Sequence, residues 1–168
     1  MKYIKTYKEN ILESSHIEAH KILHKEYSDV SQYIKDILLE LEDDGLKTNA
    51  EVSEQLSNFH GFTYIDVDIK GNLNNIKRYV DTILSINDYC ESVGFYIKMV
   101  CVHSAIIGPG SNNREVYSNI DVFERDVRKG VFSRVYDITL MITKKWTDSH
   151  MKYINTYKLF ESSELDEM

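Results

Sequence analysis

Residues 95–107 read Phe95-Tyr-Ile-Lys-Met-Val-Cys-Val-His-Ser-Ala-Ile-Ile107, and this stretch decides the fold class. β-Branched and aromatic side chains occur on both of its faces, which favours a strand inside a sheet. Gly94 stands immediately before it and Gly108-Pro109-Gly110 immediately after it, and such residues mark turns. The sequence therefore predicts its clearest strand at residues 95–107.

Apolar and polar residues alternate in three more segments, which predicts strands at residues 46–52, 62–69 and 136–142. The first two are interpreted as a hairpin or as neighbouring strands. Apolar residues at helical spacing predict one helix that ends at Gly94 and a short helix that ends at Gly130. The stretch 108–113 is expected to be a loop because of its composition.

The N-terminal part of the chain has a helical pattern. Apolar residues recur at spacings of three and four from Leu23 to Leu41, which predicts one stripe along a helix. Ser28 and Asp29 are types of residue that cap helices. The segment is therefore either one long bent helix or two helices separated at Ser28. Gly45 is the expected end, because glycine accepts a left-handed backbone.

This order of elements predicts an α+β protein in two layers. An antiparallel or mixed sheet of about four strands carries helices on one face and follows an N-terminal helical region. A chain of 168 residues suits one domain. The expected organisation is a leader-like peptide at 1–15, a single domain at 16–145 and a tail at 146–168. Within the domain, residues 16–44 are the helical region and 46–145 hold the sheet and its helices.

The composition argues against several classes of function. A net charge of −7 disfavours a nucleic-acid partner, because phosphate contacts need a basic face. Four arginines fall between residues 114 and 134, but interleaved acidic residues predict a salt-bridged surface. No apolar run approaches the roughly 20 residues that span a membrane. Cys90 and Cys101 are interpreted as reduced thiols. No membrane partner and no cofactor is expected.

Three histidines, His16, His20 and His24, follow each other at intervals of four residues. A helix would place them on one face, where imidazoles one turn apart can chelate a transition metal. The simpler interpretation is a half-polar helix face, since the first two extend the apolar stripe. A pH-sensitive contact between helices or subunits is a third alternative.

Asp66, Asp68 and Lys70 form a second candidate site. Two carboxylates and a lysine at the end of a strand can bind magnesium and assist phosphodiester hydrolysis. The order Asp68-Ile69-Lys70 resembles the acidic-x-lysine element of restriction-like nucleases, which implies a further acid on an adjacent strand, such as Glu51 or Glu54. The ordinary interpretation is the solvated face of an alternating strand.

Cys101 and His103 lie two residues apart in the strand predicted at residues 95–107, so they share a face. A nucleophilic cysteine would need this pair together with a third, orienting group. Nothing near them in the sequence supplies one, so core packing is the simpler interpretation.

One peptide occurs at both ends of the chain. Residues 1–8 return as residues 151–158, and the copies differ only at Lys5 and Asn155. Units this short and this far apart do not form a solenoid, whose repeats recur at about 20–50 residues. The repeat is therefore interpreted as a recognition peptide read by a partner. The alternatives are that the two ends act as structural arms or that the second copy is a relic of a duplicated gene start.

The first copy and the residues after it resemble the capsid-targeting peptide of internal head proteins in large contractile-tailed phages. The coinciding residues are Lys5, Thr6, Tyr7, Glu9, Ile11 and Glu13. In that family a prohead protease cuts after a Leu/Ile-x-Glu tripeptide. Ile11-Leu12-Glu13 fits this rule, as do Leu38-Leu39-Glu40 and Leu159-Phe160-Glu161. Asn10 departs from the pattern, because an aromatic residue is usual there.

The resemblance implies a non-enzymatic phage accessory protein, made in the host cytoplasm and packaged into the prohead and virion. Its partner would be a component of the phage head. One alternative is a modulator that binds a host protein, and a second is a metal-dependent nuclease built on Asp66, Asp68 and Lys70. The sequence leaves a homo-oligomer open and does not decide whether the protein is an enzyme.

Overall fold

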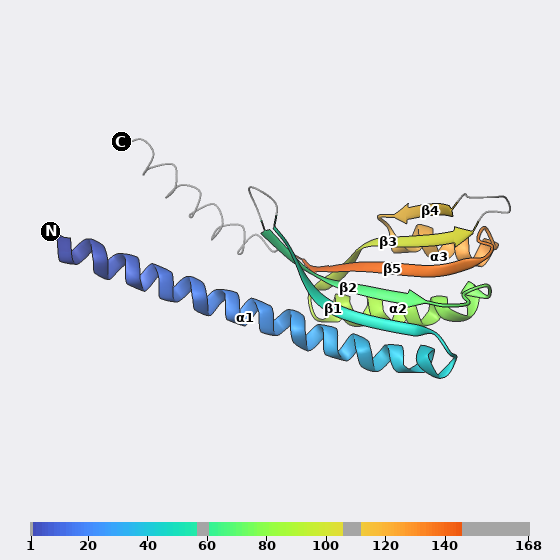
Figure 1. The fold of residues 1–168 in the computed structure, drawn as a ribbon, viewed down its shortest axis with the longest axis horizontal. Coiled ribbons are helices and arrows are strands. Elements are labelled where there is room, and N and C mark those ends of the chain that lie inside the picture. The colour runs from blue at the N-terminus through green and yellow to red at the C-terminus, as the bar shows by residue number, and fades with distance from the viewer. Residues whose placement is uncertain (1, 57–60, 106–111, 146–168) are drawn as a thin grey trace.

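The computed structural model describes residues 2–56, 61–105 and 112–145. These residues form three helices and one sheet of five strands. In chain order the elements are α1 (Lys2–Asp43), β1 (Lys47–Leu56), β2 (Gly61–Lys70), α2 (Ile76–Ser92), β3 (Phe95–Ala105), β4 (Asn112–Tyr117), α3 (Ile120–Lys129) and β5 (Val135–Lys144). Figure 1 shows them as one body with a long helix along its side.

The sheet has the strand order β1-β2-β5-β3-β4, and every neighbouring pair is antiparallel. β5 is the last strand along the chain, yet it lies at the centre between β2 and β3. The predicted α+β class is confirmed, as is the hairpin of the first two strands. The sheet has five strands instead of about four.

The additional strand, β4, covers part of the stretch that composition assigned to a loop. Asn112 and Asn113 open this strand, whereas residues 106–111 lie outside the described residues. β4 is a short edge strand, and its few apolar residues do not produce a clear alternation. The sequence signal for a strand is weak where so little of the strand is buried.

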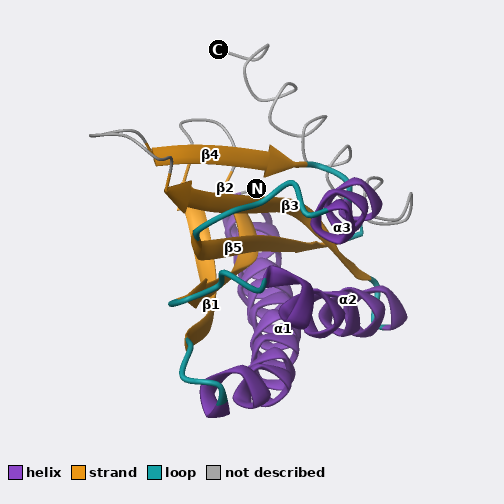
Figure 2. Ribbon diagram, turned by 90° about the vertical axis from the view of Figure 1, so that its right-hand side faces the viewer, coloured by secondary structure: helices purple, strands orange, loops and turns teal. Residues whose placement is uncertain are grey.

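The core lies between the sheet and the helices, which cover one of its faces (Figure 2). Isoleucine and valine alternate along β2, so that Ile65, Val67 and Ile69 all point into this core. α2 packs Val80, Ile83 and Ile86 against them. Each such side chain contributes roughly 1.5–3 kcal/mol when it leaves water. The alternation therefore fixes which face of the sheet is covered.

α1 is a single helix without a break at Ser28. At 42 residues it is roughly 63 Å long. Tyr27, Val30, Ile34, Leu38 and Leu41 are buried along its second half, which explains why the helix continues through the capping residues. Its N-terminal half extends beyond the sheet (Figure 1). The helix ends just before Gly45, whose φ of 84° is left-handed, as predicted.

The second face of the sheet carries no helix among the described residues, and we call it the open face (Figure 2). The register sets which side chains lie there. Asp68 of β2 pairs with Thr139 of β5, and Thr139 pairs with Cys101 of β3. In the neighbouring row, Asp137 of β5 pairs with His103 of β3. Polar groups from three strands therefore meet at the middle of the sheet.

Candidate functional site

The acidic candidates Asp66 and Asp68 lie on the open face, as the alternation of β2 predicts. Lys70 Nζ donates to Asp68 Oδ2 over 3.0 Å, and Thr139 Oγ1 donates to Asp68 Oδ1 over 3.1 Å. Each oxygen of this carboxylate therefore accepts one hydrogen bond from the protein. Glu51 lies directly across from Asp66 on β1. In the part of the chain that the structure describes, no three histidine, cysteine or acidic side chains are grouped to hold a metal ion.

Asp66 stands in an acidic neighbourhood. Its pKa is raised, first by partial burial and then by the nearby carboxylates Asp68, Asp137 and Glu51, while Lys70 opposes the shift. Like charges that share a poorly solvated site disfavour the ionised form. Glu54, the other acid considered with this group, lies farther along β1 opposite Thr63. These acidic residues therefore form a polar, negatively charged surface on the open face of the sheet.

The histidine candidates lie on α1. His24 is exposed and borders an open hollow of about 310 Å³ between α1 and β1. The side chains of His16 and His20 lie outside the described residues. Ser31, which also lines the hollow, donates its hydroxyl to the Ala50 carbonyl over 2.8 Å and so links α1 to β1. This hollow is thus a seam between two packed elements.

A second group on the open face joins residues that are distant in sequence. We call Cys101, His103, Arg114 and Asp137 the thiol cluster. His103 Nδ1 lies 3.1 Å from Asp137 Oδ2, and His103 Nε2 lies 3.8 Å from Cys101 Sγ. Arg114 Nε donates to the same sulfur over 2.9 Å. The structure therefore supplies the orienting group that the sequence around Cys101 and His103 lacks.

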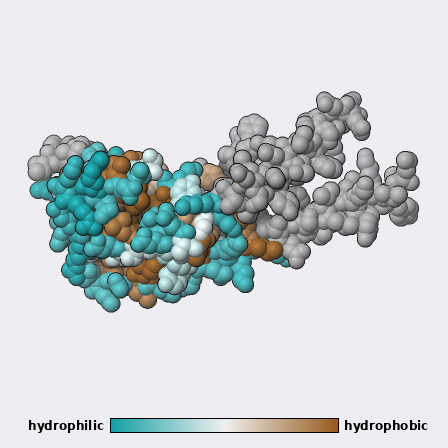
Figure 3. All heavy atoms as spheres, turned by 180° about the vertical axis from the view of Figure 1, so that it is seen from behind, coloured by the Kyte–Doolittle hydropathy of each residue, from teal (hydrophilic) through white to brown (hydrophobic). Residues whose placement is uncertain are grey.

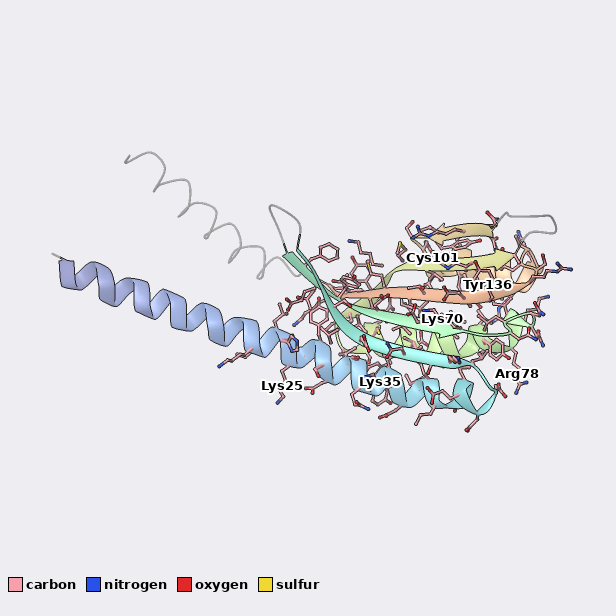
Figure 4. All side chains as sticks on the ribbon, in the orientation of Figure 1. Lys25, Lys35, Lys70, Arg78, Cys101 and Tyr136 are labelled. Atoms are coloured by element: carbon pink, nitrogen blue, oxygen red, sulfur yellow. The ribbon has the colours of Figure 1, made fainter. Side chains whose placement is uncertain are left out.

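The fold positions each member of the thiol cluster. Asp137 and Arg114 are the register partners of His103 on β5 and β4, one on each side of β3. The register shifts between His103 and Ser104, so that Tyr136 is an extra residue in β5. The Tyr136 ring stacks near His103, with ring centroids 6.3 Å apart. Figure 4 shows Cys101, Tyr136 and Lys70 on neighbouring strands.

The cluster is partly shielded from solvent. The side chains of His103 and Asp137 are 27% and 17% exposed, and Cys101 is only 2% exposed. Arg114 is exposed, and in the described part of the chain its side chain contacts the sulfur. Asp137 Oδ1 is buried without a hydrogen-bond partner among the described residues. Sequence reasoning missed Asp137 because 34 residues separate it from His103.

The targeting-peptide candidates belong to the projecting half of α1. Residues 5–13 are helical and lie ahead of the part of α1 that packs on the sheet (Figure 1). Within the described side chains, Leu23 is the first to pack against the core and Tyr27 is the first to be buried. The second copy of the peptide, residues 151–158, lies outside the described residues.

The arginine-rich stretch forms ion pairs on the surface. Arg128 contacts Glu124 over 2.7 Å and Asp81 over 3.2 Å, and Arg125 contacts Asp126 over 3.4 Å. Seen from behind, apolar groups reach the surface in separate patches among hydrophilic ones (Figure 3). The predicted salt-bridged surface is thus confirmed for these two arginines.

Comparison with known proteins gives no match: neither a family model, nor a curated protein, nor a solved structure matches this chain. Within the described residues, no helix combines the length and the apolar character needed to cross a membrane.

Proposed function

We propose that this chain is a non-enzymatic accessory protein that reaches a protein partner through the N-terminal half of α1. The partner is the head of a contractile-tailed phage, and the protein moves from the host cytoplasm into the prohead. The observation that carries the proposal is the place of residues 5–13, which belong to the half of α1 that extends beyond the sheet (Figure 1). A projecting helix segment can enter a groove on a partner.

The place of the cleavage tripeptides supports the same proposal. A cut after Glu13 would leave the whole packed part of α1, from Leu23 onward, attached to the sheet. Leu38-Leu39-Glu40 satisfies the same sequence rule but lies in that packed part, and the Leu38 side chain is completely buried. A protease would have to pull α1 away from the sheet to reach it. This difference favours the bond after Glu13 over the bond after Glu40.

The test is the intact mass of the protein in cells that assemble proheads with their protease. We expect wild-type protein in purified particles to begin at Ser14. Glu13→Gln should leave the packaged protein uncut at that bond, whereas the matched control Glu40→Gln should be processed like wild type. Scrambling residues 5–13 should abolish packaging and leave the far-UV circular dichroism of the sheet unchanged.

Two results would contradict the proposal. If protein with scrambled residues 5–13 is still packaged, these residues are not the targeting peptide. If full-length protein is found only in the lysate and bound to a host protein, the partner is that host protein and not the phage head. This result would favour a modulator that acts on the host. Scrambling residues 151–158 serves as the second control, because it alters the other copy of the peptide and leaves the first intact.

A further inference from the structure

We propose that Cys101 is a reactive thiol that forms mixed disulfides with small disulfide molecules, and that His103, Asp137 and Arg114 prepare it for this exchange. The inference is independent of the N-terminal address. It rests on the contacts of the thiol cluster and on the difference between the two cysteines of the chain.

The contacts follow the order of a nucleophile, a base and an orienting acid. A carboxylate only accepts hydrogen bonds, so the Asp137 carboxylate directs the proton of His103 to Nδ1. The lone pair on Nε2 then faces the Cys101 sulfur at 3.8 Å. A base within reach of a thiol and held in one tautomer by a third group is the arrangement that activates a nucleophile. The pairing of β3 with β5 supplies all three groups.

Arg114 favours thiol chemistry over metal binding at this place. Its Nε–H group lies 2.9 Å from the sulfur, where a bound metal cation would meet a positive charge. A guanidinium hydrogen bond is stronger to a thiolate than to a thiol, because the acceptor is then charged. The same contact raises the pKa of Arg114. Arg114 is also exposed, so rotation of its side chain would give a small molecule access to the sulfur.

The environment of Cys101 differs from that of a packing cysteine. Val100 and Val102, its neighbours in β3, belong to the hydrophobic core, and Cys101 does not. It lies on the open face beside Thr139, with polar groups around it. Cys90 provides the contrast, because it is completely buried in the core on α2. Burial raises the pKa of the Cys90 thiol to about 12. Burial therefore keeps the Cys90 thiol protonated and unreactive at neutral pH.

The exchange balances with the disulfide as the oxidant. The Cys101 thiol gives its proton to His103 Nε2, and the thiolate attacks one sulfur of the disulfide R–S–S–R. The S–S bond of the reagent breaks as a new bond forms between Cys101 Sγ and the attacked sulfur. The departing thiolate takes the proton from His103, so that the Cys101 sulfur is oxidised and the departing sulfur is reduced. Cys90 does not reverse the adduct, because it lies in the core on the far side of the sheet.

The experiment uses the full-length native protein and the neutral reagent dithiodipyridine. Released thiopyridone gives the rate, and mass spectrometry of the digested adduct identifies the modified cysteine. We expect one equivalent to react in the native state, at Cys101, and the second only after denaturation. Cys101→Ser should abolish the native reaction, and Cys90→Ala should retain it. The proposal is wrong if native Cys101 reacts no faster than Cys90, or if the adduct maps to Cys90.

The dependence of the rate on pH tests the roles of the other three residues. His103→Gln should slow the exchange by about tenfold or more at neutral pH, as expected for the loss of a general base. Asp137→Asn should also slow it, and Arg114→Gln should lower the rate at neutral pH, because the attacking sulfur loses its hydrogen-bond donor. Lys98→Gln, an exposed change in the same strand, is the matched control. Profiles that coincide with wild type in all three variants would show that these groups only pack around the sulfur.

Discussion

Leu38 and Leu39 are adjacent in sequence and differ completely in environment. Leu38 is fully buried against the sheet, whereas Leu39 is 55% exposed on the outer side of α1. Comparing a substitution at Leu38 with the same substitution at Leu39 therefore tests how much the packed half of α1 contributes to the free energy of unfolding.

We expect Leu38→Ala to lower the free energy of unfolding by roughly 2–5 kcal/mol, because it removes buried methyl groups and leaves a cavity. Leu39→Ala should change it by less than about 0.5 kcal/mol. Urea unfolding followed by circular dichroism measures both. Equal effects of the two changes would mean that α1 does not pack on the sheet through the stripe that contains Leu38.

At the scale of single residues, the sequence predicts relations along one strand and misses relations between strands. Cys101 and His103 share a face because side chains alternate, and this prediction is confirmed by their contact. Asp137 completes the cluster only through the pairing of β3 with β5 and the extra residue at Tyr136. Neither the pairing partner nor a bulge has a signature in residues 95–107. The triad-like arrangement therefore could not be predicted.

At the scale of elements, the open face of β2 concentrates negative charge around Asp66. Its raised pKa means that the folded protein holds this proton more tightly than the unfolded chain. Folding is therefore opposed above the folded pKa, and the penalty fades as the pH falls through that value. It is absent below the unfolded pKa of an aspartate, about 3.9.

We expect Asp66→Asn to raise the free energy of unfolding at pH 7 and to lose this advantage in acid. Urea unfolding at both pH values measures the difference. Asp88→Asn on the exposed surface of α2 is the control for removing one negative charge far from the acidic group. Destabilisation at pH 7, or a gain that persists below the unfolded pKa, would contradict the raised pKa.

Element prediction succeeded where packing and local pattern agree. The strands with alternating isoleucine and valine were found because one face of each is buried. The helix does not break at Ser28, because the apolar residues before and after Ser28 pack on the same core. β4 was missed because an edge strand with few buried residues has no clear period.

At the scale of the whole molecule, the projecting half of α1 and the packed body should behave independently. Removal of residues 1–20 should lower the helical signal but change the free energy of unfolding by less than about 1 kcal/mol. Removal of residues 1–29 also deletes Tyr27, which is buried with its ring centroid 4.9 Å from that of Phe95.

We expect this longer truncation to cost roughly 3–5 kcal/mol, as for other large buried aromatic side chains. Urea unfolding of the two truncated forms gives the comparison. A large loss with the shorter truncation would show that residues 1–20 pack on the body, and it would weaken the proposed role of residues 5–13 as an accessible address.

The class and the two layers of the molecule follow from its order of elements, but the order of strands in the sheet does not. Nothing in residues 136–142 distinguishes a central strand from an edge strand, since both alternate. β5 lies at the centre because it alone pairs with both β2 and β3.

This central place of β5 has a consequence for the order of synthesis. While the ribosome has not yet released residues 135–144, the emerging chain holds only two separate strand pairs, β1 with β2 and β3 with β4. A two-stranded hairpin is only marginally stable by itself, so neither strand pair forms a stable sheet before β5 is available. The sheet forms when β5 enters between the two pairs, and the same event brings Asp137 to His103. Formation of the thiol cluster therefore accompanies the closure of the sheet.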